Sequence, residues 1–286
     1  MFICNDCPRK CNIDREVKIG YCGCGILPSV TRCSPHFGEE PCISGTNGSG
    51  AVFFSGCNLK CTFCQNHEIS RKENGKKFDE YQLKDLFQSL QDKNVHNINL
   101  VTASHFIRTV AKALEMAELN IPVVWNSSGY EDTETLKMLE GLVDIYLPDF
   151  KYWDSILAKK YSNAENYPKI ASSAINEMYR QCGDYVIKDG LMVKGMIIRH
   201  LILPGYIENS MNVIDFVADN FNTDSVLFSL MSQFTIMPGC DIKRTVSYEE
   251  NETLIHYMKT RKLSGFIQDI SSSTDEMIPK FDLTGV

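Results

Sequence analysis

The sequence predicts an α/β fold in which parallel β/α units follow a cysteine-rich N-terminal segment. Two observations predict it. From residue 50 onward, short runs rich in Val, Ile and Leu alternate with stretches whose apolar residues recur at helical spacing. Ten of the 12 cysteines lie within the first 64 residues, and only Cys182 and Cys240 lie beyond them. We therefore expect two domains, a cysteine-rich segment over 1–48 and a β/α domain over 49–286.

Six short runs are expected to form buried strands, because they are apolar along most of their length, as strands covered on both faces are. They span residues 51–55, 97–102, 122–127, 143–148, 196–203 and 225–231. Four apolar stripes among these runs indicate amphipathic helices that face the core. The stripes are Leu83, Leu86, Phe87 and Leu90; Ile107, Val110, Leu114 and Ala117; Ile170, Ala174, Ile175 and Met178; and Ile214, Phe216 and Val217.

Composition and charge exclude several classes of protein. With 286 residues and 43% hydrophobic content, the chain can bury a sizeable core. Its net charge is −7, and no basic run alternates with aromatic residues, so we expect no nucleic-acid partner. The N-terminus has no basic start, and no apolar run approaches the ~20 residues that cross a bilayer, so we expect no membrane partner and a cytoplasmic location. Cysteines in that reducing compartment are expected to be metal ligands rather than disulfides.

Three cysteines stand on one loop directly after the first predicted strand. Cys57, Cys61 and Cys64 follow the apolar run 51–54. A four-iron cluster needs one terminal ligand for each iron, so a loop with three thiolates leaves one iron open to a ligand that is not protein. The alternative is a structural zinc knuckle or three buried thiols, because free cysteine is often a small core residue.

A second set of cysteines is spaced to enclose one metal. Cys4, Cys7 and Cys11 with one of Cys22 or Cys24 would make a closed tetrathiolate site. Ligand type alone does not distinguish an auxiliary iron-sulfur cluster from structural zinc. The alternative is that these thiols serve packing and bind nothing.

Several segments together resemble the radical S-adenosylmethionine (SAM) superfamily and, within it, the pyruvate formate-lyase activating enzyme-like branch. They are Cys-x-x-Cys-Pro-Arg near the start, Ser-Gly-Cys-Asn-Leu-Lys-Cys at the three-cysteine loop, Asn-Ile-Asn-Leu-Val-Thr, Val-Asp-Ile-Tyr-Leu-Pro-Asp-Phe-Lys and Ile-Arg-His-Leu-Ile-Leu-Pro-Gly. The resemblance implies a partial (β/α)6 TIM-like barrel. It also implies a 4Fe-4S cluster on Cys57, Cys61 and Cys64, whose open iron chelates the amino and carboxylate groups of SAM.

The resemblance further implies an oxidoreductase that cleaves SAM reductively to a 5'-deoxyadenosyl radical, which takes a hydrogen atom from the substrate. The cofactor performs the hard step, so no side chain is expected to be catalytic. The implied substrate is the glycine of a glycyl-radical enzyme, which would make the chain a lyase activating enzyme; the alternative is another peptide or a small molecule. A flavodoxin or ferredoxin-type reductant would be a partner. An iron-sulfur electron carrier or a zinc adaptor is the alternative from another class.

The loop after the second predicted strand departs from the family pattern. Thr102-Ala103-Ser104-His105 stands where the family usually has a Gly-Gly-Glu-like motif that binds the SAM amino group, and the glutamate is missing. That contact is left to Thr102, Ser104 or a backbone carbonyl. The alternative interpretation of His105 is that it starts the next helix and has no part in the chemistry.

Polar residues after the third and fourth predicted strands match the family. Asn126 and Ser128 resemble the Asn-Gly turn of the activating enzymes and are expected to contact the ribose or the carboxylate, or else only to form a turn. Asp149 and Lys151 match the Asp-x-Lys of those enzymes.

The last two predicted strands complete the expected SAM contacts. Arg199 lies in an apolar strand and needs an anion, because burying an unpaired guanidinium is costly. The resemblance suggests the SAM carboxylate; the alternative is an internal salt bridge with Asp144 or Asp149. Strand alternation places Arg199 and His200 on opposite faces. Gln233, after the sixth strand, is expected to meet the adenine edge.

Overall fold

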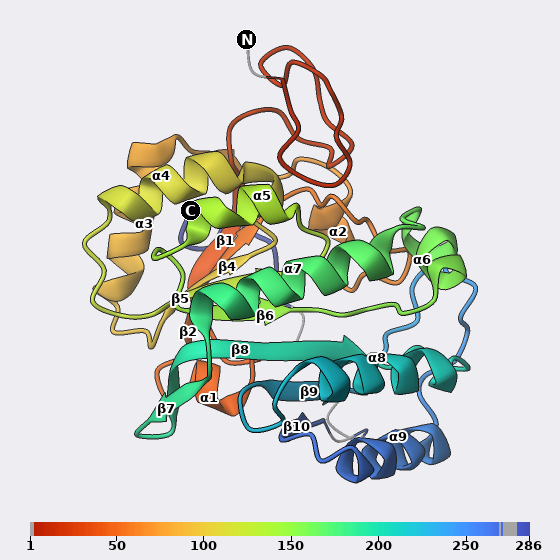
Figure 1. Cartoon of the computed structure of the whole chain (residues 1–286). Helices are drawn as coiled ribbons and strands as arrows, with labels where there is room; N and C mark the ends of the chain where they lie inside the picture. The colour runs from red at the N-terminus through yellow and green to blue at the C-terminus, as the bar shows by residue number, and fades with distance from the viewer. Residues whose placement is uncertain (1–2, 269, 271–278) are drawn as a thin grey trace.

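One mixed sheet organises the structure, a computed structural model that describes residues 3–268, 270 and 279–286 (Figure 1). The strand order is β10-β9-β8-β6-β5-β4-β2-β1-β3, with β7 paired to β8 at one side. The strands are β1 Ser29–His36, β2 Ser49–Phe54, β3 Lys76–Lys77, β4 Ile98–Val101, β5 Val123–Ser127, β6 Ile145–Pro148, β7 Val186–Lys188, β8 Leu191–Leu201, β9 Leu227–Met231 and β10 Gly265–Ile267.

The six strands expected from the sequence are confirmed as β2, β4, β5, β6, β8 and β9. Each pairs in parallel with the next, and β10 extends the series in parallel beyond β9. The largest difference is at β8, which begins at Leu191 rather than at residue 196. Its added start forms a hairpin with β7, because Asp189 and Gly190 both adopt positive φ, the conformation of tight hairpin turns. The expected α/β partial barrel is therefore present.

The strand β1 was not expected from the sequence, because its residues include Ser29, Thr31, Arg32 and Ser34 and do not read as an apolar run. It pairs antiparallel with both β2 and β3. Residues 29–36 lie in the part of the chain that the sequence assigns to the cysteine-rich segment. That segment thus contributes a strand to the same sheet.

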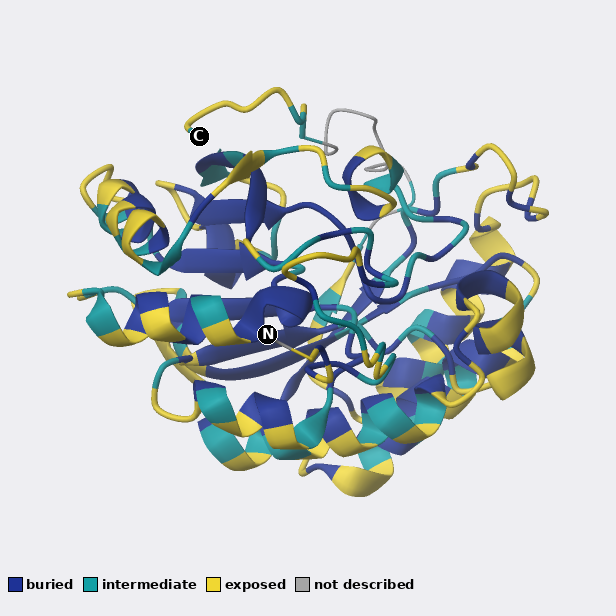
Figure 2. Ribbon diagram, turned by 90° about the horizontal axis from the view of Figure 1, so that it is seen from above, coloured by how far each residue is buried: buried dark blue, intermediate teal, exposed yellow. Residues whose placement is uncertain are grey.

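Helices cover the outer face of the sheet (Figure 1). The four predicted stripes lie on α3, α4, α7 and α8, and most of their residues are buried. Figure 2 shows the resulting alternation of buried and exposed bands along each helix. The helices are α1 Pro41–Ser44, α2 His67–Ser70, α3 Glu80–Gln91, α4 Ile107–Met116, α5 Thr133–Leu136, α6 Ser155–Ser162, α7 Tyr167–Cys182, α8 Ile207–Asn220 and α9 Tyr248–Thr260, with 3-10 turns η1 Ser104–Phe106 and η2 Lys137–Leu139.

The short helix α1 closes one end of the barrel. Its residues Cys42 and Ile43 are buried and join an apolar cluster with inward-facing residues near the starts of β5, β6, β8 and β9. These side chains exclude water from the amino-terminal end of the parallel strands. The interior that stays open lies between α1 and the carboxyl ends of the strands, which is where β/α architectures place their chemistry.

Within the described residues, none of the helices combines the length and the apolar character that a bilayer crossing requires.

Candidate active site

A cavity of about 530 Å³ lies inside the barrel, at the carboxyl ends of the parallel strands. The residues that the sequence predicts to hold the three-thiolate cluster and SAM converge on it from different elements, with Ser104 as the exception. Those that line the cavity are Cys57, Cys61, Cys64, Thr102, Asn126, Ser128, Asp149, Lys151, Arg199 and Gln233.

The three-cysteine loop forms one wall of this cavity. It starts at Gly56, whose positive φ of 79° suits glycine, and a Cβ there would lie 2.4 Å from the Cys24 sulfur. The Cys57 amide donates to the Cys22 carbonyl at 3.1 Å, and the Leu59 amide donates to the Cys57 sulfur at 3.3 Å. Phe63 packs its ring against Tyr152, Tyr161 and Phe234 and so anchors the far end of the loop.

Burial changes the protonation of two of these thiols, Cys57 and Cys64. It raises the pKa of Cys57 to about 12, with the nearby Cys61 adding to the effect, and it raises the pKa of Cys64 as well. Thiols in this state are neutral at pH 7, so a metal that binds them must displace protons. Among the described residues, no three Cys, His, Asp or Glu side chains already surround a common point. The donor set nevertheless fits a three-thiolate centre, because all three side chains line the same wall.

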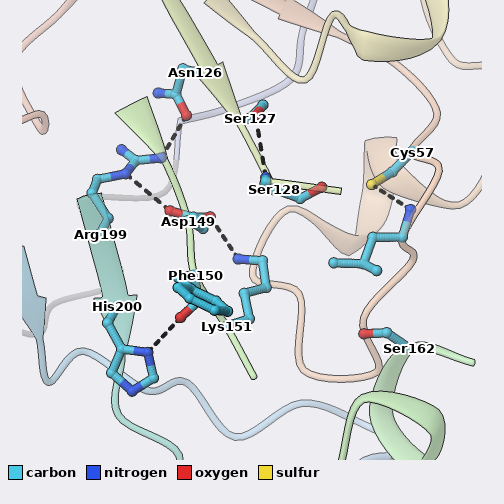
Figure 3. Close-up of polar contacts among 12 residues, drawn as sticks. Cys57, Asn126, Ser127, Ser128, Asp149, Phe150, Lys151, Ser162, Arg199 and His200 are labelled. Carbon is cyan, nitrogen blue, oxygen red and sulfur yellow. Dashed lines mark hydrogen bonds and ion pairs between the residues drawn. The ribbon is translucent and has the colours of Figure 1, made fainter. Parts of the chain in front are cut away.

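Two cations share one carboxylate on the opposite wall (Figure 3). The Arg199 Nε donates to Asp149 Oδ1 at 3.0 Å, and the Lys151 Nζ donates to Asp149 Oδ2 at 2.6 Å. Burial alone would raise the pKa of Asp149, but the charges of Arg199 and Lys151 outweigh it and hold this pKa below its usual value. The internal salt bridge that the sequence left as an alternative for Arg199 is thus made with Asp149. Asp144 instead accepts from the Val123 amide at 2.9 Å.

Arg199 has a second carboxylate partner that the sequence did not reveal. Its Nη1 donates to Glu39 Oε2 at 2.9 Å, and its Nη2 donates to Asn126 Oδ1 at 2.5 Å. Glu39 also accepts from the amides of Asn99 and Asn126 at 3.0 and 3.1 Å. The only sequence signal was the acidic pair Glu39-Glu40 directly before Pro41, and nothing in that pattern indicates burial inside a barrel.

The loop after β4 separates Thr102 from Ser104. Thr102 lines the cavity with a φ of 62°, a backbone strain that costs roughly 1–3 kcal/mol for a non-glycine residue. Ser104 does not line the cavity; its hydroxyl donates to Glu131 Oε1 at 2.5 Å, and the residue is 2% exposed. His105 lies in η1, with its Nε2 at 2.9 Å from the Ser55 carbonyl, as expected for a structural helix start.

Two further residues predicted to contact SAM, Ser128 and Gln233, form hydrogen bonds within the protein. The Ser128 carbonyl accepts from the Tyr167 hydroxyl at 2.8 Å, which fixes the turn after β5. The Gln233 side chain accepts from the Gln268 amide at 2.8 Å. Their roles toward SAM stay predictions.

The N-terminal thiols gather next to the three-cysteine loop. The pKa of Cys7 is raised to about 12, first by burial and then by the thiols of Cys4, Cys22 and Cys11. The Cys24 thiol instead points to the Ser55 carbonyl, at 3.2 Å. This grouping favours Cys22 over Cys24 as the fourth member of the set.

Arg9 ties this N-terminal segment to the barrel. Its guanidinium donates to the carbonyls of Asn58, Ser162 and Asn163 at 2.6–2.9 Å. It also lies 4.0 Å from the ring centre of Tyr21. The predicted second metal site would therefore sit against the outer side of the three-cysteine loop.

Comparisons with known proteins agree with this architecture. A family profile described as the Radical SAM superfamily matches residues 51–217. The chain is 29% identical over 262 residues to the uncharacterized protein MJ0674 of Methanocaldococcus jannaschii, covering 87% of this chain and 72% of that protein.

Two solved structures share the fold. SuiB of Streptococcus suis superposes with a TM-score of 0.51 at 15% identity, over 74% of this chain and 47% of SuiB, so this chain spans about half the length of that protein. Methylornithine synthase (PylB) superposes with a TM-score of 0.50 at 13% identity, over 91% of this chain and 70% of that one.

His200 gives a test of the strand geometry that orients Arg199. As alternation requires, His200 faces away from the cavity, with Nδ1 at 2.6 Å from the Phe150 carbonyl and Nε2 at 2.8 Å from the Ser210 hydroxyl. Burial lowers its pKa from 6.5 to about 4. The neutral ring therefore contributes stability that is full above pH 6.5 and is lost as the pH falls toward 4, by roughly 3 kcal/mol.

We expect His200→Gln to flatten the loss of unfolding free energy between pH 6.5 and 4, measured by urea denaturation at each pH. The exposed His256→Gln is the matched control and should follow the wild-type curve. Parallel curves for wild type and His200→Gln would contradict the buried neutral ring.

Proposed function

This chain belongs to the radical SAM superfamily, and on that premise we propose that it binds a 4Fe-4S cluster at Cys57, Cys61 and Cys64 and uses SAM to abstract a hydrogen atom from a substrate. The observation that carries this proposal is the convergence of the three thiols with Asp149, Lys151 and Arg199 on one cavity. When bound, the cluster supplies one electron and an open coordination position for SAM. An electron carrier or a zinc adaptor would need no such cavity behind its ligands.

Lys151 is the cation best placed to meet a carboxylate of SAM. Burial alone would lower its pKa, but Asp149 and the nearby Cys61 raise it above its usual value, so Lys151 is charged and faces the cysteine wall. Its Nζ donates to one carboxylate oxygen of Asp149, which orients the ammonium and leaves donor capacity. Arg199, by contrast, already donates to Asp149, Glu39 and Asn126. We therefore assign Arg199 to holding Asp149 and Lys151 in position.

The chain also keeps water from the reacting region. Phe54, Phe63 and Leu59 are buried and line the cavity beside the cysteines. A dry wall at this point protects a reactive radical from side reactions and strengthens every charged contact around SAM.

For the substrate, we propose the finer assignment that the sequence segments support, which is a protein glycine of a glycyl-radical enzyme, with a flavodoxin or ferredoxin-type protein as the reductant. Another peptide or a small molecule is the alternative. Co-incubation with a glycyl-radical enzyme encoded nearby tests it, because activation gives a glycyl radical signal in electron paramagnetic resonance, whereas no signal favours the alternative.

We further propose that Cys4, Cys7, Cys11 and Cys22 hold a second metal, either an auxiliary 4Fe-4S cluster or zinc. The proximity of the other three thiols to Cys7 supports it.

The cluster assignment makes a direct prediction. After anaerobic reconstitution, Cys61→Ala should form no 5'-deoxyadenosine from SAM and dithionite while staying folded, because an incomplete ligand set cannot hold the cluster. Cys182→Ala, which removes a buried thiol on α7, is the matched control and should retain activity. Wild-type product from Cys61→Ala would refute the assignment.

The second metal site is tested by metal analysis. A variant with Cys57, Cys61 and Cys64 all replaced by alanine should still contain iron or zinc after reconstitution, because the closed N-terminal site keeps its four thiolates. Replacing Cys4, Cys7 and Cys11 in addition should remove that metal. A metal-free triple variant would show that the N-terminal thiols serve packing only.

The assignment of Lys151 predicts a loss of SAM affinity. Lys151→Met removes a charge-assisted hydrogen bond of about 1.5–3 kcal/mol, so SAM should bind roughly ten- to a hundredfold more weakly in isothermal titration. Asp149 keeps Arg199 as its partner, so the variant should fold and assemble its cluster. Lys159→Met, an exposed change on α6, is the control. Unchanged affinity in Lys151→Met would assign Lys151 to the salt bridge alone.

A further inference from the structure

Glu40 is the one carboxylate of the cavity lining that has an oxygen without a partner among the described residues. Its Oε2 is buried and accepts no hydrogen bond, although Glu40 lines the cavity. Ser229 on β9 lies near this carboxyl group and also lines the cavity. An unsatisfied buried carboxylate oxygen is expensive, so a native structure that keeps one needs a reason.

A second unsatisfied acceptor belongs to Asn99, a residue that is hydrogen-bonded to Glu39, the neighbour of Glu40 in sequence. Asn99 is fully buried on β4, and its Nδ2 donates to Glu39. Its Oδ1 has no partner. We call Glu39, Glu40 and Asn99 the acceptor floor, because Glu39 and Glu40 directly precede α1 at the closed end of the barrel and Asn99 is hydrogen-bonded to Glu39. Of the three, Glu40 and Asn99 each keep one acceptor oxygen without a partner.

The charged residues of the cavity lining also leave one acid without a cation as partner. Among the described residues, this lining has three carboxylates, Glu39, Glu40 and Asp149, and two strong cations, Lys151 and Arg199. Lys151 is already bound to Asp149, and Arg199 is bound to both Asp149 and Glu39. Glu40 is thus the acid left over, and burial, followed by the charge of Glu39, raises its pKa even though Arg199 opposes this. A positive ligand would compensate the excess charge, whereas a neutral one would leave it.

The rest of the closed end suits an alkyl chain. Phe37 and Phe266 also line the cavity, and Phe266 pairs in register with Ser229, the residue that lies near Glu40. The lining would therefore offer apolar surface to the carbon stem of an ammonium or guanidinium ligand.

We propose that the acceptor floor binds an ammonium or guanidinium group, with Glu40 as its charged partner. The inference rests on the proposed function, since it concerns the ligands of the same cavity. Two ligands have this chemistry. One is SAM itself: this chain lacks the glutamate that, in the family, usually follows the second strand and binds the SAM amino group. The other is an amine or guanidine of the substrate.

Glu40→Gln separates these sources, because it keeps the shape of the side chain and removes its charge. In one arm, SAM is titrated calorimetrically into the cluster-reconstituted wild type and variant. In the other arm, n-butylammonium and its neutral counterpart n-butanol are compared by saturation-transfer NMR with SAM present. Glu208→Gln, an exposed change on α8, is the matched control for both arms.

Three outcomes are decisive. A roughly tenfold fall in SAM affinity in Glu40→Gln, without a preference of the wild type for butylammonium, supports the proposal with SAM as the source. Unchanged SAM affinity, with a roughly tenfold preference for butylammonium over butanol that Glu40→Gln abolishes, supports it with the substrate as the source. Unchanged SAM affinity together with equal binding of the two probes overturns it.

Stability gives a readout that needs no turnover. Removing an uncompensated buried charge should leave the melting temperature of the ligand-free Glu40→Gln variant unchanged or raise it. A lower melting temperature would mean that Glu40 has an internal partner and would contradict the proposal. If Glu40→Gln does not fold, Glu40→Asp, which keeps the charge and shortens the reach, is measured in the same two arms.

The proposal and the proposed function fail in different ways. Formation of 5'-deoxyadenosine by the wild type reports the proposed function. If the wild type forms no 5'-deoxyadenosine but ligand binding at Glu40 still depends on charge, the proposed function fails and the ammonium site at the acceptor floor is still supported. Product formation without any charge-dependent binding would overturn the floor alone.

Discussion

The buried guanidinium of Arg199 is the constraint on which the cavity depends. A charge taken out of water must be matched closely, and here Asp149, Glu39 and Asn126 meet it from three different parts of the chain. The same contacts orient Lys151 through the shared carboxylate. One interaction therefore joins the cation pair, β5 and β8 to the segment before α1.

That segment explains how one end of the barrel is closed. Because Glu39 is held by Arg199 inside the barrel, the residues that follow it are brought under the strands, where Cys42 and Ile43 bury their side chains. The cavity is then bounded by an apolar plug on one side and by the cysteine loop on the other. The N-terminal segment closes the outer side of that loop, through Arg9 and through the close approach of Gly56 to Cys24.

Much of the fold follows from local patterns. The six parallel strands are continuous apolar runs, and the helix stripes repeat at helical spacing, so neighbouring residues alone reveal them. The strand β1 escaped this reasoning because it is polar in part and is stabilised by pairing with β2 and β3. The same holds for β7 and β10, which are only three residues each and exist because β8 and β9 offer them an edge.

The sequence by itself determined which residues are the candidates for the chemistry. They are three thiols on one loop after a strand, and polar residues after buried strands that the fold brings to one cavity. Only the tertiary structure decided which side chains contact one another. It paired Arg199 with Asp149 rather than Asp144, turned Ser104 to Glu131, grouped Cys22 with the N-terminal thiols and placed Glu39 and Glu40 inside the barrel. Each of these pairings joins residues that are mostly distant in sequence, and a charge or hydroxyl in a local pattern is compatible with many partners until packing removes all but one.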